Sequence, residues 1–254
     1  MLKCDFHMHA REDPLDCCTY GARDLIEKAA ALKFDVLAFT FHGCVLNDPA
    51  VTEFARERGI LLIPGCEVFV ERREVLCLNI TQKEVDDIYT FQDLRAWKKA
   101  KGEAGLVIAP HPFYPVPQCL QEKFFEHPDL WDTVEYCHMH MRGLNFNAKA
   151  ERVARERGLP LVATSDAHEL FMFGTNHTLV DADKEMMAVF RAIRAGKVRH
   201  YSTPHSVWGA AKVLAFMEVW DRLARVFTAR GRAKVLARRL HRERMRIEAK
   251  GQGG

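Results

Sequence analysis

Short apolar runs alternate with longer amphipathic segments from residue 2 to residue 195. A short apolar run bounded by turn residues predicts a buried strand, and apolar residues at helical spacing predict a helix. The predicted strands lie at 2–6, 36–40, 60–63, 76–80, 106–109, 133–136, 161–164 and 178–180, and the predicted helices at 22–32, 50–58, 91–101, 147–157 and 184–195. This alternation favours an α/β fold with parallel strands joined by crossover helices.

Composition limits the class of protein. The chain has 254 residues, 48% of them hydrophobic and 28% charged, which is ordinary for a globular domain. No apolar run approaches the roughly 20 residues that span a bilayer, and the first residues lack the apolar stretch of a signal peptide. The eight cysteines include no Cys-x-x-Cys pair, so we expect reduced thiols used as small apolar residues. These features predict a cytoplasmic protein with no membrane partner.

Histidine and carboxylate side chains recur where the predicted strands end. They are His7, His9, His42, Glu67, His111, His138, Asp166 and His168. Alternate residues of a strand face the same side, so both His7 and His9 can face one ion. A lone histidine is more often a structural residue, but the carboxyl ends of parallel strands converge on one face of a barrel. The set therefore predicts a metal site.

The ordered motifs resemble those of the polymerase and histidinol phosphatase (PHP) superfamily. They are Asp5-Phe6-His7-Met8-His9, Thr40-Phe41-His42, Gly65-Cys66-Glu67, Pro110-His111-Pro112, Glu135-Tyr136-Cys137-His138 and Ser165-Asp166-Ala167-His168. The resemblance covers residues 3–205 and implies a distorted (β/α)7 TIM-like barrel with two or three metal ions at its C-terminal face. We expect a hydrolase domain at 1–205 and a basic helical extension with a disordered end at 206–254.

The resemblance also implies which residues bind each ion. The first ion would have four ligands, namely His7, His9, Glu67 and Asp166. Glu67 would bridge to a second ion held by His111 and His138, since a carboxylate has two oxygens to offer. His42 and His168 would hold a third. Mixed histidine and carboxylate ligation suits divalent zinc, manganese or iron.

Two motifs depart from the family pattern. The residue before His42 is usually acidic, and here it is Phe41, which removes a carboxylate that could support the third ion. A further ligand usually follows the first motif within several residues. Asp13 is the candidate for that ligand, with a solvated loop carboxylate as the alternative.

The implied chemistry is hydrolysis of a phosphate ester by metal-activated water. Asp166 or His168 would assist proton transfer, and Glu67 would act through the ions that it bridges. Arg11, Arg142 and Lys149 are candidates for holding the phosphate, although solvated charges explain them equally well. His140 is expected behind the ligands or facing the substrate.

A proline- and aromatic-rich segment at residues 112–128 interrupts the alternating pattern beside His111. Long loops within compact domains are usually functional or mobile. We therefore expect this segment to form a lid or a wall of the substrate site, with an incidental insertion as the alternative.

Three functions remain open at this stage. A phosphatase acting on a small phosphomonoester, histidinol phosphate being one example, is the first. The second is a nuclease or phosphodiesterase, favoured by the eleven Lys and Arg against two acidic residues in 222–250, although a solvated helix end explains that charge too. A binding module without activity is the third, and the full ligand set argues against it.

Overall fold

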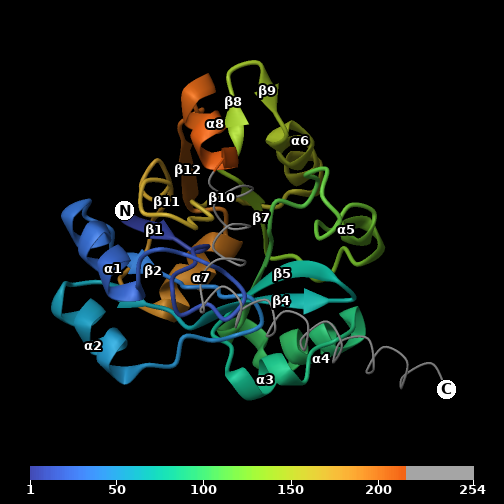
Figure 1. Ribbon diagram of the computed structural model, residues 1–254. Helices are drawn as coiled ribbons and strands as arrows, with labels where there is room; N and C mark the ends of the chain where they lie inside the picture. The colour runs from blue at the N-terminus through green and yellow to red at the C-terminus, as the bar shows by residue number, and fades with distance from the viewer. Residues whose placement is uncertain (216–254) are drawn as a thin grey trace.

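The computed structural model describes residues 1–215 (Figure 1). The predicted helical extension at 206–254 begins with α8, Val207–Ala215. Its continuation, the cationic stretch and the glycine-rich end lie outside the described residues. The predicted basic extension and the domain boundary near residue 205 therefore stay predictions.

Ten strands form two five-stranded sheets rather than one closed barrel in the described part of the chain. In order, the first sheet contains β12 (Val198–Ser202), β11 (Asn176–Val180), β1 (Leu2–Asp5), β2 (Val36–Leu37) and β3 (Leu61–Leu62). The second contains β10 (Leu161–Ala163), β7 (Thr133–Tyr136), β6 (Leu106–Ala109), β5 (Arg73–Leu78) and β4 (Gly65–Val70). A short hairpin, β8 (His140–Met141) and β9 (Leu144–Asn145), stands apart.

The prediction that the strands are all parallel is correct only for part of each sheet. β1, β2 and β3 run parallel, as do β6, β7 and β10. However, β4 and β5 form an antiparallel hairpin, and β5 also pairs antiparallel with β6. A tight turn through Glu71 and Arg72, both at positive φ, joins the hairpin. A connection this short reverses the chain, so β4 and β5 cannot be parallel.

Two isolated bridges connect segments of the two sheets. Met8 pairs with Ala167, and His42 pairs with Glu67. The bridging segments run parallel, which brings the chain after β1 beside the chain after β10. The predicted metal ligands therefore lie where the two sheets meet.

Helices surround the sheets (Figure 1). They are α1 (Ala22–Ala31), α2 (Pro49–Glu57), α3 (Gln82–Asp86), α4 (Phe91–Lys101), α5 (Lys123–Glu126), α6 (Asn147–Arg157), α7 (Met186–Arg194) and α8, with a 3-10 turn at Gly102–Ala104. The predicted helices at 91–101 and 147–157 match α4 and α6. Thr90 begins α4 by accepting from the Asp93 N–H, and Gly158 ends α6 in the left-handed conformation. No helix in residues 1–215 is long and apolar enough to cross a membrane.

Apolar side chains from both sheets fill the space between them. Phe6 and Val36 from the first sheet pack in one buried cluster with Leu76, Ile108 and Val162 from the second. Burying an aliphatic or aromatic side chain of this size contributes about 1.5–3 kcal/mol. This core holds together the strands whose ends carry the metal-ligand candidates.

Candidate metal centre

Four of the predicted ligands converge at the junction of the sheets. His7 and His9, after β1, are fully buried, and Glu67 in β4 is 2% exposed. Nε2 of His7 lies 3.3 Å from Nε2 of His9 and 3.3 Å from Oδ1 of Asp166. Oε2 of Glu67 lies 3.5 Å from Nε2 of each of the two histidines. The donor atoms of His7, His9 and Asp166 lie within 4.8 Å of one another, which is close enough to share one ion.

A second group of donors gathers around Asp16. Its Oδ2 lies 3.0 Å from Nδ1 of His42, 3.1 Å from Nε2 of His168 and 3.5 Å from Nδ1 of His9. The predicted third-ion ligands, His42 and His168, are thus brought together, and Asp16 is a member that the sequence reasoning missed. Its only signal was a second aspartate in the loop after His9. Loop conformation, rather than spacing, places it at the site.

Asp13 lies beside this group but has a different set of contacts. Its Oδ2 accepts the His42 backbone N–H at 3.0 Å and is 2.9 Å from Nδ1 of both His9 and His42. Its Oδ1 accepts the Leu15 N–H at 2.7 Å. Asp13 is fully buried, so the alternative of a solvated loop carboxylate is excluded. Its contacts suit a residue that orients the two imidazoles.

His111 faces a third group, whose composition differs from the prediction. Its Nε2 lies 3.6 Å from Oε1 of Glu67 and 4.0 Å from Oε2 of Glu74. His138, the predicted partner of His111, instead groups with Cys137 and Asp166. Neither the Nε2 of His138 nor the Oε1 of Glu67 has a hydrogen-bond partner among residues 1–215. Glu74 was not predicted, since one glutamate at the start of a strand carries no sequence signal.

Glu135, at the end of β7, organises the ligands from behind. Its Oε1 lies 2.7 Å from Nδ1 of His7 and also accepts from the Thr164 hydroxyl, and its Oε2 accepts the His111 N–H at 2.6 Å. The carboxylate–histidine contact leaves Nε2 of His7 directed at the ligand cluster. Partners of this kind fix the tautomer and orientation of a ligand. Sequence reasoning noted Glu135 only as part of the motif containing His138.

The backbone at the site takes uncommon conformations. His111 and Asp166 have φ of 24° and 43°, which non-glycine residues rarely adopt. Gly65 allows β4 to approach the chain after β2, because a Cβ there would lie 2.9 Å from Cγ2 of Thr40 and 3.0 Å from the Phe39 carbonyl oxygen. This close approach places Glu67, two residues later, at the junction.

The electrostatics of the cluster couple acids and bases strongly. Burial lowers the pKa of His7, but Asp166, Glu135 and Glu67 outweigh it and hold that pKa well above its usual value. Burial raises the pKa of Glu67, and His7 and His42 reverse this, so the pKa of Glu67 falls well below its usual range. Burial and the charge of Glu67 raise the pKa of Glu74 to about 7. Divalent ions would replace the protons that these imidazoles otherwise hold.

The residues present fit a cluster of divalent transition-metal ions. The donors are imidazole nitrogens and carboxylate oxygens, the ligands that zinc, manganese and iron share. The carboxylates are buried together, and an uncompensated group of this kind is costly without cations. Oε1 of Glu67 and Nε2 of His138, which have no hydrogen-bond partner within residues 1–215, are positioned to accept an ion. Access is from the side of His42, His111 and His168, whose side chains are 12–18% exposed.

The predicted phosphate-binding cations lie apart from this cluster or are already engaged. Arg11 donates to the Thr19 carbonyl. Arg142 is exposed in the β8–β9 turn. Nζ of Lys149 lies 4.4 Å from the centroid of the Phe113 ring. Nε2 of His140 lies 2.7 Å from Oγ of Ser202. Their substrate-binding roles stay predictions.

The segment at 112–128 packs against the core beside His111 rather than forming a detached loop, and its role as a lid or substrate wall stays a prediction. Phe113 and Phe124 are buried in a core cluster with residues of β4, β5 and β6. The Tyr114 hydroxyl donates to the Met139 carbonyl at 2.7 Å, and Sγ of Cys119 lies 3.2 Å from Nδ1 of His111. The contact with Cys119 therefore holds the His111 ring in place.

The comparisons confirm the resemblance to the PHP superfamily. Residues 145–198 match the model of the family described as PHP-associated. Over 163 residues the chain is 22% identical to an uncharacterized protein of Methanocaldococcus jannaschii, covering 61% of this chain and 93% of that one. The matched family segment begins in β9 and runs through α6, β10, β11 and α7 to β12.

Solved structures share the fold. A two-domain protein from Bacteroides vulgatus containing a predicted PHP-like metal-dependent phosphoesterase matches with a TM-score of 0.61 and 19% identity, over 79% of this chain and 64% of that one. The lesion-specific endonuclease PfuEndoQ from Pyrococcus furiosus matches with a TM-score of 0.56 and 14% identity, over 84% and 66%. PsfC from Pseudomonas syringae matches with a TM-score of 0.59 and 15% identity, over 84% and 95%. This chain thus spans about two thirds of the first two proteins.

Proposed function

We propose that this protein is a metal-dependent phosphoesterase that hydrolyses a phosphomonoester at a site of two or three divalent ions. The observation that carries the proposal is the junction of the sheets, where Glu67 lies within 3.6 Å of His7, His9, His42 and His111. No other residue of the cluster contacts as many imidazoles. A carboxylate at this position is suited to bridging two ions, and its unpartnered Oε1 supports that role.

Bound ions would activate water for attack and offset the negative charge of the phosphate group. The chain's own residues would hold and orient the reactants. Asp166 and His168 lie at the accessible side, where either side chain would assist proton transfer to or from the substrate. Nδ1 of His168 lies 3.0 Å from the backbone carbonyl oxygen of Asp166, which leaves its Nε2 to face the cluster. Asp13 and Glu135 would keep the imidazoles of His9, His42 and His7 in place.

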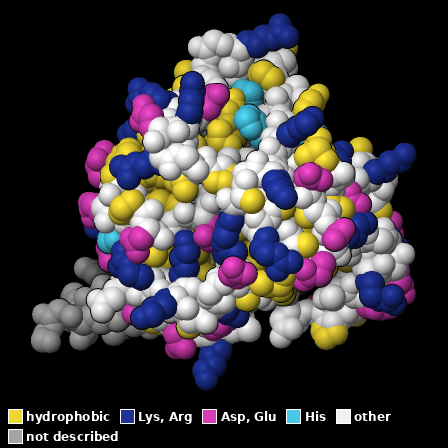
Figure 2. Space-filling view, turned by 180° about the vertical axis from the view of Figure 1, so that it is seen from behind, with side chains coloured by type: hydrophobic (Ala, Val, Ile, Leu, Met, Phe, Trp, Pro, Cys, Tyr) yellow, Lys and Arg dark blue, Asp and Glu magenta, His cyan; other side chains and the backbone are white. Residues whose placement is uncertain are grey.

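A nuclease is the second candidate, favoured by the shared fold with PfuEndoQ. Another match, with a TM-score of 0.50 and 16% identity over 76% of this chain and 55% of that one, is an Endonuclease Q complex with a 27-mer duplex containing an abasic lesion. On the face in Figure 2, Lys and Arg are interspersed with Asp and Glu and form no continuous basic surface. Because duplex binding depends on basic surface along the phosphate backbone, this face offers no extended track for a duplex.

Two substrate panels separate these candidates. Metal-loaded protein would be assayed on small phosphomonoesters, including histidinol phosphate, and on short oligonucleotides with and without an abasic site. We expect turnover of the phosphomonoesters, and turnover of oligonucleotides alone would refute that reading. Glu67→Ala and Asp166→Ala should each abolish activity. Elemental analysis of the purified protein would identify the ions among zinc, manganese and iron.

A further inference from the structure

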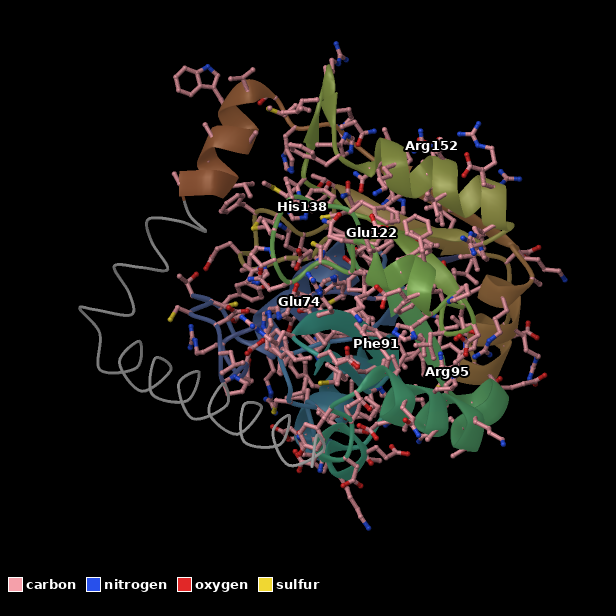
Figure 3. The ribbon with its side chains drawn as sticks, turned by 90° about the vertical axis from the view of Figure 1, so that its right-hand side faces the viewer. Glu74, Phe91, Arg95, Glu122, His138 and Arg152 are labelled. Atoms are coloured by element: carbon pink, nitrogen blue, oxygen red, sulfur yellow. The ribbon has the colours of Figure 1, made fainter. Side chains whose placement is uncertain are left out.

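Glu74 is a nearly buried carboxylate that faces the metal-ligand candidates from an unexpected strand. It lies in β5, in the hairpin with β4 that carries Glu67, and its side chain is 11% exposed. Figure 3 shows Glu74 at this hairpin, with His138 above it in the same view. Within residues 1–215, the one ion pair of the Glu74 side chain is with His111, where Oε2 of Glu74 lies 4.0 Å from Nε2 of His111.

His111 is oriented so that only one of its ring nitrogens faces this carboxylate. Nδ1 is 3.2 Å from Sγ of the buried Cys119, on the far side of the ring from the cluster. Nε2 is therefore the nitrogen available to an ion, and it points at Glu67 and Glu74 together. A ligand imidazole usually has its second nitrogen held in this way.

The second observation is the state of Glu67. Glu67 is only 2% exposed, and its Oε1 lies 3.6 Å from Nε2 of His111. This oxygen has no hydrogen-bond partner among the described residues. A buried carboxylate oxygen without a donor is costly, and a second carboxylate beside it adds repulsion. A cation between the three side chains would satisfy both carboxylates at once.

We propose that Glu74 is a ligand of the second metal ion and shares it with Glu67 and His111. The three donor atoms lie within 4.8 Å of one another, which is close enough for a single ion. The ion would then have two carboxylates and one imidazole, a harder oxygen-rich set that favours manganese or iron over zinc relative to a histidine-rich set. The inference rests on the proposed metal-dependent function, because it assumes that the cluster binds metal.

The test is metal binding rather than activity. Wild-type protein, Glu74→Gln and the control Glu71→Gln would be stripped with a chelator and titrated with Mn²⁺ alone, and bound ions would be counted by elemental analysis. Glu71 lies in the turn of the same hairpin and is exposed, so it is a matched control. We expect Glu74→Gln to lose one ion per chain or to bind it at least about ten-fold more weakly, and Glu71→Gln to match wild type.

A melting experiment separates a metal ligand from a structural residue. If Glu74 binds metal, Glu74→Gln without metal should melt no lower than wild type, because the substitution removes a buried charge. Its gain in melting temperature on adding Mn²⁺ should be smaller than that of wild type. Unchanged ion number and affinity in Glu74→Gln would overturn the proposal. Should that variant not fold, Glu74→Ala also removes the carboxylate, and wild-type ion number and affinity in it would equally overturn the proposal.

The outcomes for Glu74 and for the proposed function are distinct. A wild-type protein that binds the ions but hydrolyses no phosphate ester would refute the proposed function. The number of ions bound by Glu74→Gln would still decide whether Glu74 is a ligand. Hydrolysis together with unchanged metal binding by Glu74→Gln would refute only the Glu74 assignment. A wild-type protein that binds no Mn²⁺ would refute both.

Discussion

Nδ1 of His7 lies 2.7 Å from Oε1 of Glu135, although 128 residues separate the two in the chain. The contact crosses from the first sheet to the second, and both side chains are fully buried. It leaves Nε2 of His7 directed at Glu67 and Asp166. A residue behind the ligands thus decides which nitrogen of His7 faces the ions.

Replacing Glu135 by Gln should weaken metal binding without removing a direct ligand. Gln keeps the shape but loses the charge that sets the His7 tautomer, so we expect Mn²⁺ affinity to fall by about 10- to 100-fold. Calorimetric titration would measure it, with the exposed Glu156→Gln in α6 as the control. Wild-type affinity in Glu135→Gln would show that His7 does not need this partner.

Asp16 and Asp13 should give different results when changed to Asn. Asp16 contacts His9, His42 and His168, so Asp16→Asn should lower the ion count by one per chain. Asp13 contacts His9 and His42 from one side, so Asp13→Asn should keep the count and lower the affinity. Elemental analysis of both variants would check this. The same count in Asp16→Asn as in wild type would assign Asp16 to a supporting role.

Removing the metal should lower the thermal stability of the protein. A ligand present at 100 times its Kd stabilises the native state by about 2.7 kcal/mol, and each kcal/mol shifts Tm by about 2–4 °C for a chain of this size. Chelation should therefore lower Tm by about 5–10 °C for each ion lost. Thermal melts before and after chelation would measure this, with Mn²⁺ added back as the control. Equal melting temperatures would argue against a buried metal cluster.

His177 should make the protein sensitive to mild acid. Burial, with a smaller effect of Lys3, lowers the pKa of His177 from 6.5 to about 4. The unfolded chain therefore binds more protons between these values, so the stability that neutral His177 contributes is complete above pH 6.5 and declines as the pH falls toward 4. His177 packs 4.9 Å from Tyr201 and 6.0 Å from Phe34 between ring centroids, so Phe should fit in its place.

The measurement compares melting temperatures of wild type and His177→Phe from pH 7 to pH 4.5. We expect the variant to lose less stability as the pH falls, because its side chain cannot take up a proton. His138, His140 and His205, whose pKa values are also lowered, remain in both proteins, so the difference between the curves reports His177. Parallel curves would contradict the prediction.

Local pattern was sufficient for the features that depend on near neighbours. The helical spacing of 91–101 and 147–157 predicted α4 and α6, because these helices depend on contacts three and four residues apart. The parallel strands β1, β2 and β3 followed from apolar runs separated by helices. His7, His9 and Asp166 stood out for the same reason, since each follows an apolar run that ends within a few residues.

Only the tertiary structure decided the rest. The turn through Glu71 and Arg72 contains no glycine or proline, so nothing local announced the antiparallel β4–β5 hairpin that positions Glu74. Asp16, Glu74 and Glu135 are ordinary acidic residues in sequence, and they become part of the site because two sheets meet there and exclude water around them. His7 and His9 could be recognised as metal-ligand candidates from their spacing. The carboxylates that would bind the same ions, or that orient the two imidazoles, reach the site only through contacts between distant strands.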